Sequence, residues 1–236
     1  MSKVVNVSNE VKNLDMEFHY GELKMVVGEE FSVNVEGVEA EKIIIEECGD
    51  VLKIYDQRQT RRIKAKNIFF GKNTEEKGCV ITFTIPEAIN FDRVSVRTGA
   101  VDADIESIKT AILTLEMGVG DVDIEHLEVT NYGKVSTGTG DIEINSGCMN
   151  DMNMGFGVGD VDIDAKMTGD SKISVGVGDL SLVLEGEQSD YCISASKAIG
   201  ACHIHGFDVS GNNSYGVGAN KITASSAVGE ISISLK

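Results

Sequence analysis

The sequence predicts an all-β solenoid, because one short pattern is repeated five times between residues 94 and 184. The copies are VSVRTGAVDADI, LTLEMGVGDVDI, GKVSTGTGDIEI, MNMGFGVGDVDI and SKISVGVGDLSL. Their first turn glycines are 19, 20, 19 and 19 residues apart, at Gly99, Gly118, Gly138, Gly157 and Gly176. A constant period of this size is typical of stacked-repeat folds, in which each repeat forms one coil.

Each copy contains two short runs of alternating apolar residues. In the second copy these are Leu113, Leu115 and Met117 before the turn, and Val122 and Ile124 after it. A period of two indicates β-strands with one buried face. Because two short strands cannot bury that face alone, we expect each strand to pair with its equivalent in the next coil.

In four of the five copies the two strands are joined by a Gly-x-Gly-Asp corner, and the first copy has Gly-Ala-Val-Asp at the same place. Glycine adopts positive φ angles without steric cost, and an aspartate side chain accepts hydrogen bonds from N–H groups of a turn. We therefore expect structural turn residues in three columns. Besides the first glycines given above, they are Gly120, Gly140, Gly159 and Gly178, and the corner aspartates Asp102, Asp121, Asp141, Asp160 and Asp179.

A second acidic column follows two residues after the corner, at Asp104, Asp123, Glu143 and Asp162. Neighbouring coils are ~4.8 Å apart, so stacked carboxylates would repel each other by roughly 1 kcal/mol in water. We expect N–H groups to stabilise the corner aspartates. The outward column is then the candidate ligand-binding site, which responds to cations and binds Ca²⁺ weakly if at all.

Residues 1–90 are expected to form irregular β coils or a cap, and residues 91–236 the regular repeats of one continuous domain. A cap is needed because an open terminal strand would template aggregation. Within the first region, residues 57–78 form a basic loop. It contains Arg58, Arg61, Arg62, Lys64, Lys66, Lys72 and Lys77. We expect a solvated loop; the alternative is a docking loop for an acidic partner, of which the acidic flank of another copy is one example.

After Leu184 the pattern continues less regularly in three segments, which begin at Ala198, Gly216 and Ala227. Taken in this order, they predict that an incomplete last coil ends the stack near Leu235. Alanine replaces the corner aspartate at positions 201 and 219. The acidic corner is therefore expected only in the middle coils.

Charge and composition limit the partners. The net charge is −17, and residues 98–190 carry 19 acidic residues against four lysines, a local balance of −15. Such a surface repels nucleic acid and anionic lipid. No apolar run is long enough to span a membrane, so direct membrane insertion is not expected. If Met1 is the native start, the absence of a signal peptide predicts a cytoplasmic protein.

The succession of segments resembles the DUF4097 type of bacterial β-strand repeat proteins, which carry an adhesin label. The resemblance rests on GELKMVVGEEFSVNVEG, DVLKIYD, VITFTIP and the tandem TGAVDADI and GVGDVDI units, and it covers roughly residues 10–235. It implies a right-handed, β-helix-like solenoid of about 19-residue coils with an irregular N-terminal β region. It also implies a role at the cell surface or envelope, although the chain shows neither the signal nor the membrane helix of anchored members.

Motifs of common enzymes and cofactor sites are missing from the sequence. There is no GxSxG, HExxH or P-loop motif, and the Gly-x-Gly pairs are solenoid corners. His203 and His205 are two residues apart and are weak candidates for a surface metal pair, because a zinc site usually needs three or four protein ligands. We therefore expect no cofactor and no catalytic residue.

Two classes of function remain open. The first is a non-enzymatic scaffold or adhesin-like binding protein that presents the acidic repeat face to a protein or a polysaccharide. Self-association through the solenoid ends or through the basic loop 57–78 belongs to this class. The second is a carbohydrate-active enzyme, a hydrolase or lyase, which rests on fold analogy and on the many carboxylates that a hydrolase needs. The first class is favoured.

Overall fold

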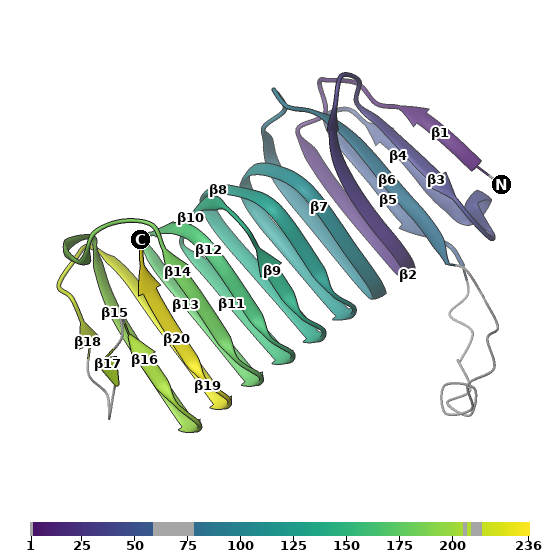
Figure 1. Cartoon of the computed structure of the whole chain (residues 1–236). Helices are drawn as coiled ribbons and strands as arrows, with labels where there is room; N and C mark the ends of the chain where they lie inside the picture. Colours follow the sequence, from purple (N-terminus) through teal and green to yellow (C-terminus); the bar gives the residue numbers. More distant parts are fainter. Residues whose placement is uncertain (1, 59–77, 205–206, 209–213) are drawn as a thin grey trace, which may run out of the picture.

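The computed structural model describes residues 2–58, 78–204, 207–208 and 214–236. The strands of these residues join into one continuous sheet that winds into an elongated stack (Figure 1). The described residues contain no α-helix and only two short 3₁₀ turns, at Ala40–Lys42 and Gln188–Asp190. The chain is therefore all-β and solenoid-like, as its sequence predicts.

The strands fall into three groups along the chain. The first comprises β1 (Ser2–Asn6), β2 (Asn13–Gly28), β3 (Ser32–Glu36), β4 (Ile43–Cys48), β5 (Val51–Asp56) and β6 (Cys79–Pro86). The second comprises β7 (Phe91–Val119), β8 (Val122–Thr139), β9 (Ile142–Ile144), β10 (Gly147–Asn150), β11 (Met152–Val158), β12 (Val161–Thr168), β13 (Asp170–Val177) and β14 (Leu180–Leu184). The third comprises β15 (Tyr191–Ile199), β16 (Cys202–Ile204), β17 (Phe207–Asp208), β18 (Ser214–Tyr215), β19 (Asn220–Val228) and β20 (Ile231–Leu235).

Parallel pairing in the second group places equivalent residues of successive repeats beside each other. Asp104 pairs with Asp123, Asp123 with Glu143, and Glu143 with Asp162. Because side chains alternate along a strand, this register also aligns the apolar residues inside the coil. One such internal column is Ile105, Ile124, Ile144, Ile163, Leu182, Ile233 and Ile204, all buried.

The C-terminal coil does not end the stack. Strand β19 pairs with β13 on one side and with β15 on the other, and β20 lies in the same way between β14 and β16. Figure 1 shows these last strands, in yellow, between green ones. The prediction that an incomplete coil at Leu235 closes the stack is therefore wrong. Strands β15 and β16 form the outermost coil. The chain then turns back, so that β19 and β20 lie between this coil and the coil of β13 and β14.

The glycines at 216 and 218 are not a corner of the predicted kind. Ile222 follows them in β19 and pairs with Ser171 of β13 and Ile193 of β15. Both partners lie near the start of the strand that opens their coil. The Gly-Val-Gly sequence therefore precedes a coil instead of joining its two strands. Its resemblance to the repeat shows that glycines mark a turn, but not which turn of the coil.

Both ends of the stack are covered by antiparallel strands. At the N-terminal end β2 lies between β7 and the pair β5 and β6; β3 pairs with β6, β1 with β3, and β4 with β5. At the other end β17 and β18 pair with β16 and β15. Short antiparallel strands of this kind limit edge-to-edge pairing between molecules.

Candidate functional site

The corner between the two strands of each coil depends on glycine. Gly120, Gly140, Gly159 and Gly178 have φ angles of 134° to 144°. A Cβ atom on Gly159 would also lie 2.1 Å from the carbonyl oxygen of Gly140 in the preceding coil. At the first glycine of each corner φ is ordinary, but a Cβ on Gly157 would lie 2.2 Å from the Gly138 carbonyl oxygen. Close stacking of the corners thus excludes side chains at both positions.

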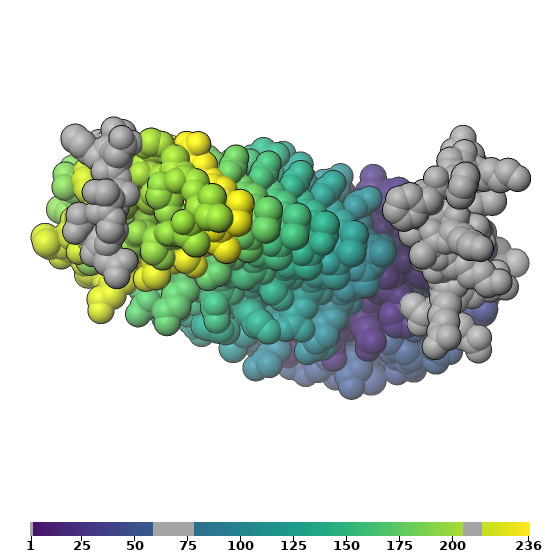
Figure 2. Space-filling view, turned by 90° about the horizontal axis from the view of Figure 1, so that it is seen from below, coloured from purple at the N-terminus to yellow at the C-terminus, as the bar shows by residue number. Residues whose placement is uncertain are grey.

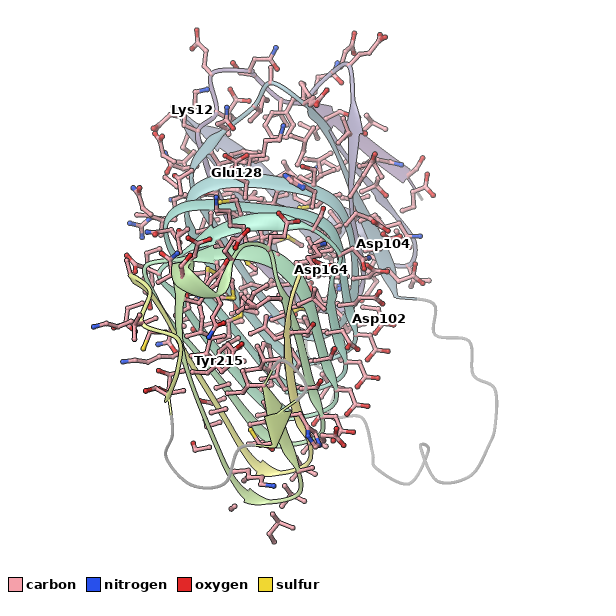
Figure 3. All side chains as sticks on the ribbon, turned by 60° about the vertical axis from the view of Figure 1, so that its left-hand side comes forward. Lys12, Asp102, Asp104, Glu128, Asp164 and Tyr215 are labelled. Atoms are coloured by element: carbon pink, nitrogen blue, oxygen red, sulfur yellow. The ribbon has the colours of Figure 1, made fainter. Side chains whose placement is uncertain are left out.

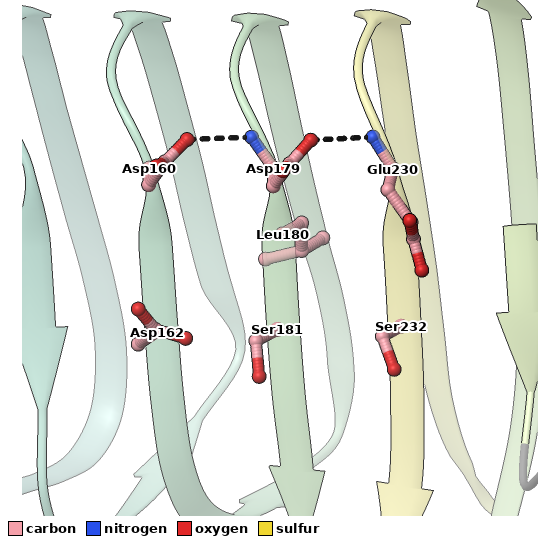
Figure 4. A pocket seen from close by; sticks show the side chains of 7 residues that line it. All are labelled: Asp160, Asp162, Asp179, Leu180, Ser181, Glu230 and Ser232. Carbon is pink, nitrogen blue, oxygen red and sulfur yellow. Dashed lines mark hydrogen bonds between the residues drawn. The ribbon is translucent and has the colours of Figure 1, made fainter. Parts of the chain in front are cut away.

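The corner acids form a ladder of hydrogen bonds from coil to coil. In each step the Oδ1 atom of one aspartate accepts a hydrogen bond from the backbone N–H of the next acid in the column. The donor–acceptor distances are 3.2 Å (Asp121 to Asp102), 2.9 Å (Asp141 to Asp121), 2.8 Å (Asp160 to Asp141), 2.9 Å (Asp179 to Asp160) and 2.7 Å (Glu230 to Asp179). The last two steps are drawn in Figure 4. Each aspartate therefore fixes the corner of the neighbouring coil.

The acidic corner reaches further than the sequence suggests. Glu230 belongs to the C-terminal coil, which stacks directly on the coil of Asp179. The expectation that this column is confined to the middle coils is therefore wrong. The signal was present in the sequence, because the segment that begins at Ala227 carries Glu230 at the corner position.

Two further columns of acidic residues run beside the corner. The outward column contains Asp104, Asp123, Glu143 and Asp162, all exposed, and the third contains Glu106, Glu125 and Asp164. We call these residues and the corner acids the acidic face. It consists of Asp102, Asp104, Glu106, Asp121, Asp123, Glu125, Asp141, Glu143, Asp160, Asp162, Asp164, Asp179 and Glu230. Figure 3 shows Asp102, Asp104 and Asp164 on the same side of the ribbon.

Few of the described basic groups neutralise the acidic face. Lys236 Nζ lies 2.6 Å from Asp164. Lys24 is the neighbour of Asp104 in the strand register, but its Nζ pairs with Glu22, at 4.0 Å. In the strands that precede the corners, by contrast, basic and acidic side chains of neighbouring coils lie side by side. Arg97 lies 3.5 Å from Asp15 and 3.6 Å from Glu116, and Lys134 also contacts Glu116. The hydrogen bond from Lys134 lowers the pKa of Glu116.

A shallow groove of about 320 Å³ lies on the acidic face near the C-terminal coil (Figure 4). Its lining residues are Asp160, Asp162, Asp179, Leu180, Ser181, Glu230 and Ser232. Ser181 and Ser232 continue the outward column after Asp162, so shorter hydroxyl side chains replace carboxylates here.

Only one of the two predicted metal ligands lies among the described residues. His203 pairs with Ser232 in the strand register and lies 3.6 Å from Glu230, whereas His205 lies outside the described residues. Within the part of the chain that the structure describes, no three His, Cys, Asp or Glu side chains are arranged to hold a metal ion. Weak Ca²⁺ binding by the outward column stays a prediction.

Arg58 is buried and does not belong to a solvated basic loop. Its Nε and Nη2 atoms donate hydrogen bonds to the two carboxylate oxygens of Asp56, at 2.9 and 2.6 Å. Its guanidinium lies 3.8 Å from the centre of the Tyr20 ring and donates a hydrogen bond to the Tyr20 carbonyl oxygen. The prediction for this residue was wrong because a run of basic residues gives no sign of a partner elsewhere in the chain. Residues 59–77 of the predicted basic loop lie outside the described residues.

No helix among the described residues is long and apolar enough to cross a membrane.

Three of the solved structures that resemble this chain are as follows. A candidate cell adhesion protein of Clostridium sporogenes ATCC 15579 is 18% identical, with 100% of this chain and 99% of that chain covered and a TM-score of 0.39. A candidate adhesin of Bacteroides fragilis NCTC 9343 is 15% identical, with coverages of 99% and 96% and a TM-score of 0.44. A candidate lipid binding protein of Parabacteroides distasonis ATCC 8503 is 12% identical, with coverages of 98% and 96% and a TM-score of 0.39.

A comparison with curated proteins found no match. The family model described as Toastrack DUF4097 matches residues 8–234, which is nearly the whole chain. The chain therefore belongs to the DUF4097 (Toastrack) family.

Proposed function

We propose that this protein is a non-enzymatic, adhesin-like binding scaffold that presents its acidic face to a cationic partner. The proposal is carried by the outward column, in which Asp104, Asp123, Glu143 and Asp162 follow one another in neighbouring coils. Carboxylates at this spacing repel one another by roughly 1 kcal/mol per adjacent pair in water. A cationic partner reduces this repulsion, so its binding also stabilises the arrangement of the carboxylates on the face.

The fold itself does not require these charges. The corner ladder needs one side-chain oxygen per coil, which asparagine would supply without a charge. The outward column is exposed, and its hydrogen bond from Asn145 Nδ2 to Asp123 Oδ1 is long at 3.4 Å. The presence of negative charge at both columns therefore supports a role in recognition, where complementary charge sets association rate and specificity.

The proposal includes the finer features of the architecture and the location. We propose a right-handed winding with coils of about 19 residues, an N-terminal capping region over residues 1–90 and regular repeats over 91–236. We further propose that the protein acts at the cell envelope, where a basic protein segment or an amine-bearing polysaccharide would meet the acidic face. Nucleic acid and anionic lipid are disfavoured as partners because the face repels them.

A binding experiment with a neutralised face tests this function. The test variant carries Asp104→Asn, Asp123→Asn, Glu143→Gln and Asp162→Asn. The control removes the same charge from exposed acids of the N-terminal part, with Glu10→Gln, Glu29→Gln, Glu30→Gln and Asp92→Asn. Both are titrated with chitosan oligomers and with a lysine-rich peptide at fixed ionic strength. We expect at least tenfold weaker binding for the test variant alone; equal weakening in both would show that only net charge matters.

The carbohydrate-active enzyme remains the alternative, and the groove beside Asp160 and Asp162 is the observation that favours it. A hydrolase would use one carboxyl as acid and a second as base or nucleophile. Assays on a panel of acidic and neutral polysaccharides separate the two functions. Turnover that Asp160→Asn abolishes would overturn the scaffold.

A further inference from the structure

A row of exposed apolar side chains runs along the corner edge, immediately beside the corner acids. Strand register places Val119 next to Thr139, and continues through Val158, Val177, Val228 and Ile199. The exposed fractions are 55% for Val119, 49% for Val158, 47% for Val177, 41% for Val228 and 65% for Ile199. We call this row, with Thr139, the apolar ridge. Figure 2 looks onto the edge of the stack that carries it.

The fold does not explain why the row is apolar. Thr139 occupies the same position between Val119 and Val158, so the corner accepts a polar β-branched residue. The ridge also projects, because Val158 lies between Gly157 and Gly159, which have no side chains. An aligned row of solvent-exposed valines is the kind of patch that a protein contact covers.

The residues beside the ridge define the chemistry of what covers it. Asp121, Asp141, Asp160 and Asp179 follow the ridge two residues further along each coil, and Glu230 continues their ladder. A covering segment therefore needs apolar side chains for the ridge and positive charges for the acids. The ridge of a second copy does not fit, since it brings its own row of carboxylates.

We propose that the apolar ridge docks the basic segment, residues 61–72, of a second copy of this chain. The segment reads RRIKAKNIFFGK, with five basic residues, no acidic residue and four large apolar residues at Ile63, Ile68, Phe69 and Phe70. It combines both properties that the corner edge requires. The proposal deepens the proposed function, on which it rests for the use of the corner acids as a cation-binding surface.

Arg58, which precedes the segment by three residues, lies at the same edge. Arg58 is held on Tyr20, Tyr20 pairs with Ala100, and Ala100 precedes Val119 in the corner column. Five coil steps from Val119 to Ile199 amount to ~24 Å, and twelve extended residues span up to ~40 Å. Two copies with antiparallel corner edges can therefore each place the segment on the ridge of the other. Such a reciprocal contact closes as a dimer.

Sedimentation of the full-length protein over 1–200 µM at low and high salt tests the proposal. We expect a concentration-dependent dimer that weakens as salt screens the charges. Val158→Thr with Val177→Thr keeps the β-branched shape found at Thr139, and Lys64→Glu with Lys66→Glu reverses charge on the segment. Each pair should weaken dimerisation at least tenfold. The matched control, Val4→Thr with Val38→Thr, changes valines that are exposed elsewhere (65% and 63%) and should have no effect.

Mixing two defective proteins identifies the copy that supplies the segment. A variant with Val158→Glu and Val177→Glu retains its segment, and the Lys64→Glu, Lys66→Glu variant retains its ridge. If docking is between copies, the two variants form a heterodimer when they are mixed, although neither forms a homodimer. A mixture that recovers nothing, or a protein that is monomeric at every concentration, overturns the proposal. A monomer that still binds cationic partners through Asp104 and Asp123 leaves the proposed function intact.

Discussion

Asp141 and Asp160 are joined by a hydrogen bond of 2.8 Å from the Asp160 backbone N–H to the Asp141 carboxylate. The bond links two coils through a side chain, in addition to the backbone pairing of the strands. It needs an oxygen acceptor but not a negative charge. The contribution of geometry and the contribution of charge can therefore be separated at one position.

The first prediction concerns Asp141. Asp141→Ala removes the acceptor and should lower the free energy of unfolding by about 1 kcal/mol. Asp141→Asn keeps the acceptor and relieves repulsion from neighbouring acids, so its stability should lie within about 0.5 kcal/mol of the parent. Urea denaturation at pH 7 measures both. An asparagine variant as unstable as the alanine variant would show that the charge itself supports the corner.

A second prediction compares two glycines of one coil. At Gly159 the φ angle is 144° and a Cβ would lie 2.1 Å from the Gly140 carbonyl oxygen, whereas a Cβ added at Gly155 would have no neighbouring atom within 4 Å. Gly159→Ala should lower the free energy of unfolding by at least about 2 kcal/mol. Gly155→Ala should leave it unchanged or raise it slightly. Equal melting temperatures for the two variants would contradict the corner geometry.

The sequence predicts the middle of the molecule well because the information there is local and repeated. Each repeat gives its own turn glycines and its own inward apolar residues, and parallel stacking of identical repeats admits one simple register.

Neighbour relations at the two ends are not encoded locally. Nothing in residues 220–235 shows that they stack on β13 and β14 instead of on the coil that precedes them in the chain. The burial of Arg58 also depends on Tyr20, 38 residues away. Both features arise from tertiary packing, which a pattern within one segment does not record.

The position of the C-terminal coil leads to a third prediction. Deletion of residues 219–236 removes β19 and β20, so β13 and β14 lose their neighbours while β15 and β16 lose their support. Open strand edges promote association between molecules. We expect a lower melting temperature and larger species in size-exclusion chromatography.

Deletion of Ser2–Asn6 is the control for that truncation. It removes β1, which pairs with β3 and with no other described strand, so the loss of melting temperature should be smaller. A monomeric protein with an unchanged melting temperature after deletion of 219–236 would mean that β15 and β16 can settle directly on β13 and β14.

The last prediction concerns the buried pair of Arg58 and Asp56, whose side chains are fully inaccessible to solvent. Burial alone would raise the pKa of Asp56, but hydrogen bonds from the Arg58 side chain and from the backbone N–H groups of Arg58 and His19 lower it below its usual value. A carboxylate with a lowered folded-state pKa contributes stability that is complete above the unfolded pKa of ~3.9 and is lost as the pH falls through the folded value.

In Arg58→Leu the carboxylate of Asp56 stays buried without its partner, so its pKa should rise and the stability of the variant should fall as the pH rises. We therefore expect Arg58→Leu to cost about 3–5 kcal/mol at pH 7 and clearly less at pH 4, in chemical denaturation at both pH values. Arg97→Leu, which removes a half-exposed ion-pairing arginine, should cost less than about 1 kcal/mol at either pH. A loss for Arg58→Leu that is the same at pH 4 and pH 7 would show that packing of the arginine on Tyr20, and not its charge, holds this end of the fold together.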